Sequence, residues 1–195
     1  MSQAQSPNGR TISEELDLVR KFMNTIDVED DKDSLLSPSD LQAWLAEHRL
    51  LNHPGGADTV TDRDLQRARA LRHALRGLAR ANHDRIADPA ALAELNQLAA
   101  ELPLAVRFGG VDDARLVPLG TGSDAALARL VAAVFEAMQE RTWERVKICR
   151  EDTCQWAFYD NSRNRSGAWC SMAVCGNRNK VRRYQQRRKS GEAKE

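Results

Sequence analysis

Through its first 140 residues, the chain places apolar side chains at every third or fourth position, in stretches separated by short polar segments. Thr11 and Glu14 form a capping-box pattern ahead of the first stretch. Later stretches begin at Ser37 and Asp88, each followed by a proline suited to a first helical turn, and at Thr61. Apolar residues at this spacing indicate one buried face of a helix. The pattern therefore predicts four helices that pack through their apolar faces.

A different pattern begins after residue 103. Apolar residues alternate from Leu104 to Phe108, glycines and aspartates follow, and a second apolar run ends at Leu119. Alternation around turn residues predicts a β-hairpin. Ser123 is then expected to cap a long helix that ends near Trp143. Together these patterns predict an α+β fold, in which a mainly helical N-terminal domain contains a small β-sheet.

All four cysteines lie in one stretch near the C-terminus, as a C-x4-C pair, fifteen residues and a second C-x4-C pair. Thiolates are preferred ligands of tetrahedral zinc, and four of them leave no coordination position for water or substrate. The alternative is two disulfides in a secreted domain, but the polar start of the chain lacks the apolar segment of a signal peptide. The spacing favours one structural Zn²⁺ per chain, with the ligands Cys149, Cys154, Cys170 and Cys175.

The order of elements around the cysteines is typical of a treble-clef zinc module. An aromatic-rich strand follows the first pair, a turn and a second strand lead to the second pair, and a helix follows. Cys170 and Cys175 are about 140° apart around a helix, so they cannot share one helical face. We therefore expect Cys170 just before the helix and Cys175 in its first turns. Gly176 is expected to allow a close backbone approach beside the metal.

The segment after Cys175 is strongly basic. From Gly176 to Lys189 it carries seven cations and no acid, and Val174, Val181 and Tyr184 recur at a spacing that predicts one inner apolar stripe. A helix with this charge suits a nucleic-acid phosphate backbone, whereas the alternative is a solvated basic tail. Two more cations lie on the connection between the cysteine pairs. The residues predicted to contact nucleic acid are Arg163, Arg165, Arg178, Lys180, Arg182, Arg183, Arg187, Arg188 and Lys189.

Charge is divided unevenly along the chain. The formal net charge is +1, but residues 141–195 carry fourteen Lys/Arg and six Asp/Glu, a balance of +8, which leaves −7 for the rest. An acidic body joined to a basic module is typical of nucleic-acid-binding proteins. No apolar run reaches the roughly 18 residues that a membrane span requires. The expected location is the cytoplasm, in association with the nucleoid, and no membrane partner is expected.

Several motifs carry a family resemblance. The first cysteine pair, the run Asp160-Asn-Ser-Arg-Asn-Arg165, the run Trp169-Cys-Ser-Met172 and the run Cys175-Gly-Asn-Arg178 resemble the CGNR-type zinc finger of bacterial proteins. In that family the finger follows an ABATE domain, which is regarded as a stress-induced transcription regulator. The first 140 residues resemble this domain more loosely, for example at Asn24-Thr25.

This resemblance implies a bacterial DNA-binding transcription regulator. The expected partner is duplex DNA, and the N-terminal domain is expected to sense a small-molecule effector or to form a homodimer. The expected division is a tail at 1–10, an ABATE-like regulatory or dimerisation domain at 11–141, a zinc finger with its basic helix at 142–189, and a tail at 190–195. The cores of the domain and the finger are expected to be separate.

Two other function classes are alternatives to a DNA-binding regulator. An enzyme is not expected, because the four-cysteine site is closed and the sequence has no Gly-rich phosphate loop or H-E-x-x-H pattern. The four histidines also lie outside the finger, at His48, His53, His73 and His83. RNA binding or protein docking by the same helix is the stronger alternative.

Two further groups of residues have more than one interpretation. Trp156, Phe158 and Trp169 are able to stack on single-stranded RNA, but more often such residues form the small core of a finger. Six arginines between Arg63 and Arg80 are able to bind an anionic ligand, but more often such a run is a solvated helix face. We favour the structural interpretation for both groups.

Overall fold

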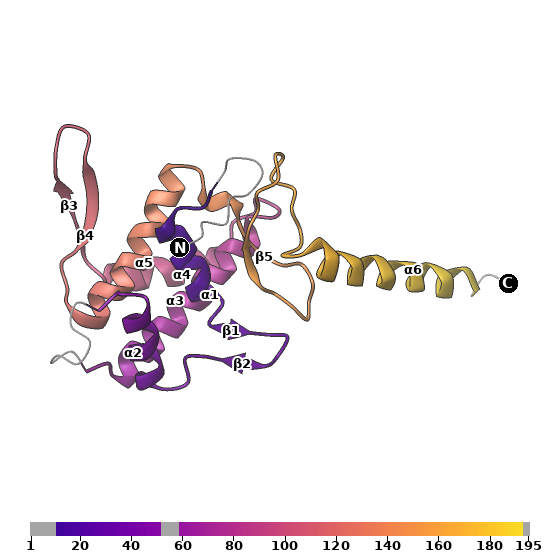
Figure 1. The fold of residues 1–195 in the computed structure, drawn as a ribbon, viewed down its shortest axis with the longest axis horizontal. Coiled ribbons are helices and arrows are strands. Elements are labelled where there is room, and N and C mark those ends of the chain that lie inside the picture. The colour runs from indigo at the N-terminus through magenta and orange to yellow at the C-terminus, as the bar shows by residue number, and fades with distance from the viewer. Residues whose placement is uncertain (1–10, 52–58, 193–195) are drawn as a thin grey trace.

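The structure is a computed structural model that describes residues 11–51 and 59–192, with the side chains of 189–192 excluded. Its order of elements confirms the predicted α+β class, mainly helical and with small two-stranded sheets (Figure 1). The helices are α1 (Glu14–Met23), α2 (Pro38–Glu47), α3 (Asp62–Ala81), α4 (Pro89–Ala100), α5 (Gly122–Gln139) and α6 (Asn177–Glu192). The strands pair as β1 (Ile26–Asp27) with β2 (Lys32–Asp33), β3 (Leu104–Phe108) with β4 (Ala114–Pro118), and β5 (Val146–Ile148) with β6 (Ala157–Tyr159), all antiparallel.

Side-chain caps set most of the helix starts. Ser37 and Thr61, where the sequence predicts helix starts, each form a reciprocal capping box with the aspartate three residues later. The first start was placed wrongly at Thr11, because the Oγ of Ser13 accepts the N–H of Leu16 and the helix begins one residue after Ser13. Helix α5 also begins earlier than expected, at Gly122 rather than after Ser123.

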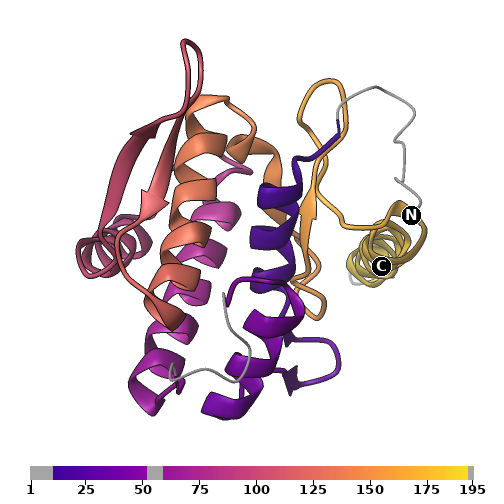
Figure 2. The same cartoon turned by 60° about the vertical axis from the view of Figure 1, so that its left-hand side comes forward.

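The main core lies between α1, α3 and α5, which run side by side in Figure 2. Val19, Leu75 and Leu127 are among the apolar side chains that these helices bury completely. Helix α4 packs on another side of α3. A Cβ at Gly77 would lie 2.7 Å from the Cβ of Ala91, so glycine is what allows these two helices to approach so closely.

The hairpin predicted for residues 104–119 is confirmed as β3 and β4. It stands out from the helices, with its base beside α5 and its tip in solvent (Figure 1). Val106, Phe108 and Val111 are exposed on it, and Arg107 lies opposite Arg115 across the strands.

The hairpin β5–β6, which carries the first cysteine pair, belongs to the main core. Val146, Ile148 and Ala157 are buried in the same cluster as the helices, so the expectation of two separate cores is wrong for this part of the finger. The side chain of Asn24 pairs with the backbone of Ala157, accepting its N–H at 2.7 Å and donating to its carbonyl at 2.9 Å. An amide in this position completes the hydrogen bonding of an edge strand and fixes the hairpin to the end of α1.

The arginine run of α3 is not simply a solvated face. Arg72 and Arg76 are buried, with 6% and 8% of their surfaces exposed. Arg72 binds both carboxylate oxygens of Asp33 at 2.6 Å. Arg76 donates to the carbonyls of Met23 and Gln155, at 3.0 and 2.9 Å. These two arginines join α3 to the β1–β2 turn and to the loop that carries the first cysteine pair.

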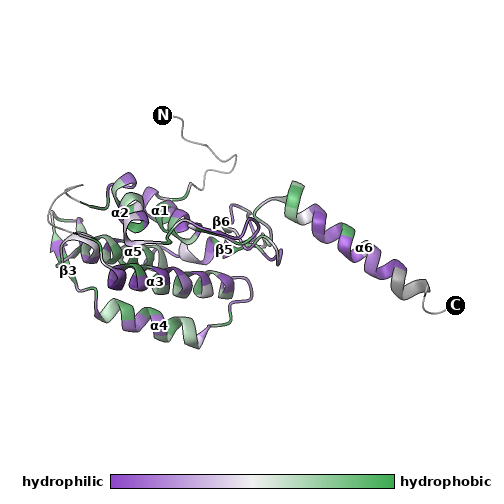
Figure 3. Ribbon diagram, turned by 90° about the horizontal axis from the view of Figure 1, so that it is seen from below, coloured by the Kyte–Doolittle hydropathy of each residue, from purple (hydrophilic) through white to green (hydrophobic). Residues whose placement is uncertain are grey.

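Helix α6 extends away from the rest of the molecule, as Figures 1 and 3 show. Val174, Val181 and Tyr184 are therefore 46–62% exposed, and the predicted inner stripe has no surface to pack against. Figure 3 also shows that α6 is polar along most of its length. Within the described residues, none of the helices has the length and apolar character needed to cross a bilayer.

Candidate metal centre and nucleic-acid interface

The four cysteines come from two local structures. Cys149 directly follows β5, and Cys154 lies three residues before β6 begins at Ala157, so the first pair sits in the turn of the β5–β6 hairpin. Cys170 precedes the short π-helix η2 (Met172–Gly176), and Cys175 lies within it. This confirms the expected positions of the second pair relative to the helix. The first pair differs from expectation, because one strand comes before it instead of both coming after it.

The geometry of the sulfur atoms fits a tetrahedral metal. The four Sγ atoms all lie within 4.8 Å of one another, and Cys170 Sγ is 3.6 Å from Cys154 Sγ and 3.7 Å from Cys175 Sγ. A tetrahedral zinc with Zn–S bonds of about 2.3 Å separates its sulfurs by about 3.8 Å. All four residues are free thiols, whereas a disulfide would bring two sulfurs to about 2.05 Å.

Burial disfavours the ionisation of two of these thiols, Cys170 and Cys175, when no cation is near. Burial raises the pKa of Cys175 to about 12, and the neighbouring sulfurs of Cys154 and Cys149 add to this effect. The pKa of Cys170 is raised for the same reasons. A bound zinc ion supplies the positive charge that stabilises four thiolates, and it closes the site by tying both local structures together. Because protons compete with the metal, zinc affinity is expected to fall as the pH falls.

The three aromatic residues of the finger lie against the cysteines. Trp156, Phe158 and Trp169 are partly buried in this cluster, which fits the interpretation of a small core. Gly176, which directly follows Cys175, does allow a close approach, because a Cβ there would lie 2.9 Å from the Sδ of Met172.

A buried ion pair holds the loop between the cysteine pairs. Lys147 Nζ donates to Asp160 Oδ2 at 2.8 Å and to the carbonyl of Arg165 at 2.5 Å, and both side chains are only 2% exposed. Asp160 also accepts the N–H groups of Ser162 and Gly167. Burial alone would raise the pKa of Asp160, but the bonds from Lys147, Ser162 and Gly167 outweigh it and lower the pKa to about 2.

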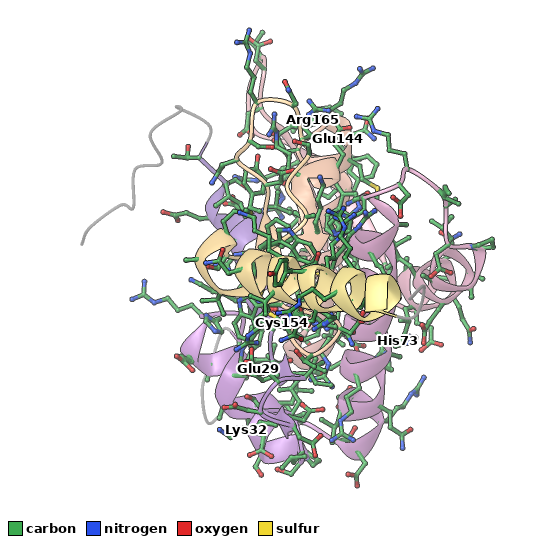
Figure 4. All side chains as sticks on the ribbon, turned by 90° about the vertical axis from the view of Figure 1, so that its right-hand side faces the viewer. Glu29, Lys32, His73, Glu144, Cys154 and Arg165 are labelled. Atoms are coloured by element: carbon green, nitrogen blue, oxygen red, sulfur yellow. The ribbon has the colours of Figure 1, made fainter. Side chains whose placement is uncertain are left out.

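The predicted nucleic-acid contacts fall into two groups, and the first group is paired with acids. Arg178 contacts Glu29 of the β1–β2 turn at 2.7 Å, and Arg182 contacts the fully buried Glu151 in the loop between Cys149 and Cys154. Arg165 contacts Glu144. In Figure 4, Arg165 and Glu144 lie on one side of α6 and Glu29 on the other. Arg178 therefore links α6 to the N-terminal body, whereas Arg182 links it to the loop of the first cysteine pair and Arg165 holds the loop between the pairs.

The second group is Lys180, Arg183 and Arg187. At 100° per residue they lie within about 60° of one another around α6, roughly opposite Arg178 and Arg182. All three are exposed, and none has an acidic partner within 4.0 Å among the described residues. Arg163 and Arg188 are also exposed, and the side chain of Lys189 lies outside the described residues. We call Lys180, Arg183 and Arg187 the outer face of α6.

Several residues of this site were missed by sequence reasoning. Asp160 and Lys147 are thirteen positions apart, and Glu151 reads as an ordinary polar loop residue. Glu29 is far from the finger in sequence. The one usable signal was that Asp160 opens a run which the CGNR resemblance singled out.

The histidines do not add to the metal site. The only group of three or more metal-ligand side chains among the described residues is the four cysteines. His48, His73 and His83 are described and supply no ligand, while His53 lies outside the described residues.

Comparison with known proteins gives two family matches in this order. Residues 16–140 match the family ABATE, described as "Putative stress-induced transcription regulator", and residues 145–188 match the CGNR zinc finger. No curated protein matches the chain. The first match covers more than half of the sequence, and the second contains all four clustered cysteines. The chain therefore belongs to the ABATE family and ends in a CGNR zinc finger.

Proposed function

We propose that the protein is a DNA-binding transcription regulator, and that the outer face of α6 contacts the phosphate backbone of duplex DNA. The observation that carries this proposal is a projecting helix with three clustered cations that have no acidic partner among the side chains the structure describes. The ABATE and CGNR matches support the same function.

The dimensions of α6 suit this role. Lys180 and Arg187 are separated by about 10 Å along the helix axis, and the major groove of B-DNA, about 12 Å wide, admits one helix. Three neutralised phosphates give a log–log salt dependence of about −3. Exposed Arg163 on the finger loop is placed to add a fourth contact.

The paired arginines have a different proposed role. The sequence suggested Arg178 for base recognition, but its contact with Glu29 directs it toward the body. We assign to Arg178 and Arg182 the orientation of α6 rather than base reading. The four-cysteine zinc then acts as a treble-clef-like structural element that fixes where α6 begins, with one zinc per chain.

The N-terminal domain is proposed to regulate rather than to catalyse. Its function as a sensor or dimerisation module, and a cytoplasmic location, follow from the proposed regulation of transcription. Dimerisation is also expected on physical grounds, because one short helix makes few base contacts and a dimer doubles them.

The test is duplex-DNA binding measured by fluorescence anisotropy at several salt concentrations. The Arg183→Ala/Arg187→Ala variant should bind more weakly and lose about two units of salt slope. A matched control is Arg107→Ala/Arg115→Ala, which removes the same charge from the β3–β4 hairpin at the far end of the molecule (Figure 1). Equal losses in both variants, or no loss in either, would contradict the proposal. Preference for structured RNA over duplex DNA would favour the RNA-binding alternative.

A further inference from the structure

A pocket lies where the N-terminal domain meets the finger. It has a volume of about 360 Å³ and is lined by Arg85, Met138, Arg141, Trp143, Glu144 and Arg165. These residues come from three separate places, which are the turn after α3, the end of α5 with the residues that follow it, and the loop between the cysteine pairs. Nothing in the zinc site or in the outer face of α6 uses this pocket.

The pocket has an excess of positive charge. Three guanidinium groups and a single carboxylate line it, and this carboxylate, from Glu144, contacts Arg165 and lies 3.3 Å from Arg85. Arg141 is exposed and has no acidic partner within 4.0 Å among the described residues. Guanidinium groups bind carboxylates and phosphates through paired hydrogen bonds. The carboxylate of Glu144 therefore occupies part of a positively charged site, and the oxyanion group of a ligand could take the same place.

The backbone conformation of these arginines is a second observation that points to a functional site. Arg85, Arg141 and Arg165 have φ values of 55°, 57° and 53°, in the left-handed region where glycine or asparagine is favoured. Only six non-glycine residues in the described chain have positive φ, and three of them are the arginines of this pocket. Strained positions of this kind gather at functional sites, because a required side chain justifies the strain.

The rest of the lining is apolar. Trp143 is buried, and Met138 is 40% exposed toward solvent. An apolar wall beside three guanidinium groups fits a molecule with both an oxyanion group and a hydrocarbon or aromatic part.

We propose that this pocket binds a small organic anion, whose carboxylate or phosphate group takes the place of Glu144 between Arg85, Arg141 and Arg165. The ligand would bridge the N-terminal domain and the loop that carries Arg163 and Arg165. Binding of the anion to the pocket does not depend on the proposed function. The role of the anion as an effector of DNA binding does rest on that function.

Isothermal titration calorimetry of the full chain tests the site, with benzoate, inorganic phosphate and benzylammonium as probes. We expect at least one of the two anions to bind with a stoichiometry of one, and the cation not to bind. Binding of benzoate alone identifies a carboxylate ligand, and binding of phosphate alone identifies a phosphate ligand. Absence of binding by both anions overturns the proposal.

Three variants of pocket residues test the site, and they are expected to change anion affinity in opposite directions. Arg85→Ala and Arg141→Ala should weaken anion binding roughly tenfold or more, because each removes a charged hydrogen-bond donor. Glu144→Gln should strengthen it, because it removes the competing carboxylate while nearly preserving the shape. The matched controls are Arg115→Ala and Glu140→Gln, exposed residues with the same charge changes outside the pocket. Weaker binding in Glu144→Gln, or equal effects in the controls, would contradict the proposal.

The outcome is separable from that of the proposed function. The Arg183→Ala/Arg187→Ala variant should bind the anion as the unmodified protein does, even where it no longer binds DNA. Anion binding without any DNA binding would reject the regulatory role and support the anion site. DNA binding without anion binding would reject the anion site and support the regulatory role. Thermal unfolding of each variant verifies that all of them are folded.

Discussion

The two halves of the zinc module are attached to the protein in different ways. The first half is the β5–β6 hairpin with Cys149 and Cys154, and its apolar residues are part of the main core. The second half begins with Cys170, contains Cys175 and continues into α6, which projects into solvent (Figure 1). Two half-exposed arginines of α6 hold the second half, because Arg178 contacts Glu29 of the body and Arg182 contacts Glu151 of the first half.

This difference shows what the metal contributes. The first half is held by core packing, by Asn24 and by Arg76, so it has a fixed position without zinc. The exposed ion pair of Arg178 with Glu29 contributes at most about 1 kcal/mol, which leaves Arg182 and the buried Glu151 as the main side-chain contact of α6. Four zinc–thiolate bonds would connect the second half to the rigid first half, and so they would determine the direction in which α6 points.

The largest expected effect follows from removing a ligand of the second half. In Cys175→Ser, residues 169–188 should lose their fixed structure, while β5 and β6 should remain folded with the body. Zinc binding contributes about 10–16 kcal/mol to the folding of isolated finger peptides, so its loss is not offset by two ion pairs. Hydrogen–deuterium exchange should show lost protection after residue 168 and retained protection at 146–148.

The control for this experiment is zinc removal by a chelator from the unmodified protein, which should give the same exchange pattern. Exchange that increases equally in β5 and in the start of α6 would show that the whole module unfolds as one unit. Retained protection in both halves, with zinc absent, would show that the metal has no structural role.

The next effect concerns the ion pair that holds the first half to its loop. Asp160→Asn should destabilise the protein by about 3–5 kcal/mol, because it leaves Lys147 as a buried charge without its partner. Chemical unfolding at pH 7 measures this loss. A control is Asp112→Asn on the exposed β3–β4 turn, which should change stability by no more than about 0.5 kcal/mol.

The same carboxylate predicts a pH dependence with a defined sign. The pKa of Asp160 is about 2 in the folded protein and about 3.9 in an unfolded chain, so ionised Asp160 stabilises the fold above pH 4. This contribution, on the order of 2 kcal/mol, should disappear as the pH falls from 4 to 2. Zinc-free protein should be used, so that the cysteines do not take up protons in the same experiment. An unchanged acid transition in Asp160→Asn would refute the assignment.

Core packing of the first half predicts the third effect. Ile148→Ala should lower the free energy of unfolding of the whole domain by about 2–5 kcal/mol, since Ile148 is buried with the helices. Val181→Ala removes apolar atoms from the second half, where the side chain is 55% exposed, and should change stability by at most about 0.5 kcal/mol. Similar losses of unfolding free energy in the two variants would show that the two halves do not differ in how they pack against the body.

The sequence predicted features that depend on neighbouring residues. The helix starts at Ser37 and Thr61, the hairpin at 104–119 and the cysteine cluster each arise from local geometry within a few residues, or from ligand pairs with a fixed spacing. Such patterns have few alternatives, because caps, turns and metals require particular side chains at particular distances.

What the sequence did not predict depends on contacts between distant segments. Asn24 meets Ala157 across 133 positions, and Arg72 is buried only because Asp33 and Thr25 surround it. The same reasoning applies to Val181 and Tyr184, whose helical spacing predicts burial but cannot show whether another surface is present. Amphipathic spacing predicts which side chains share one face of a helix. Only the tertiary structure shows whether another element packs against that face.

The smallest expected effect concerns the contact between Arg178 and Glu29. Both side chains are about 40% exposed, so Glu29→Gln should change stability by less than about 1 kcal/mol. DNA binding should respond more clearly, because the change frees one cation at the start of α6. We expect higher affinity and a salt dependence about one unit steeper. Glu15→Gln, an exposed acid on α1, removes the same charge without releasing an arginine, and it should leave the salt slope unchanged. A steeper slope in both variants would point to overall charge, whereas a steeper slope in Glu29→Gln alone would show that the body restrains Arg178 until DNA is bound.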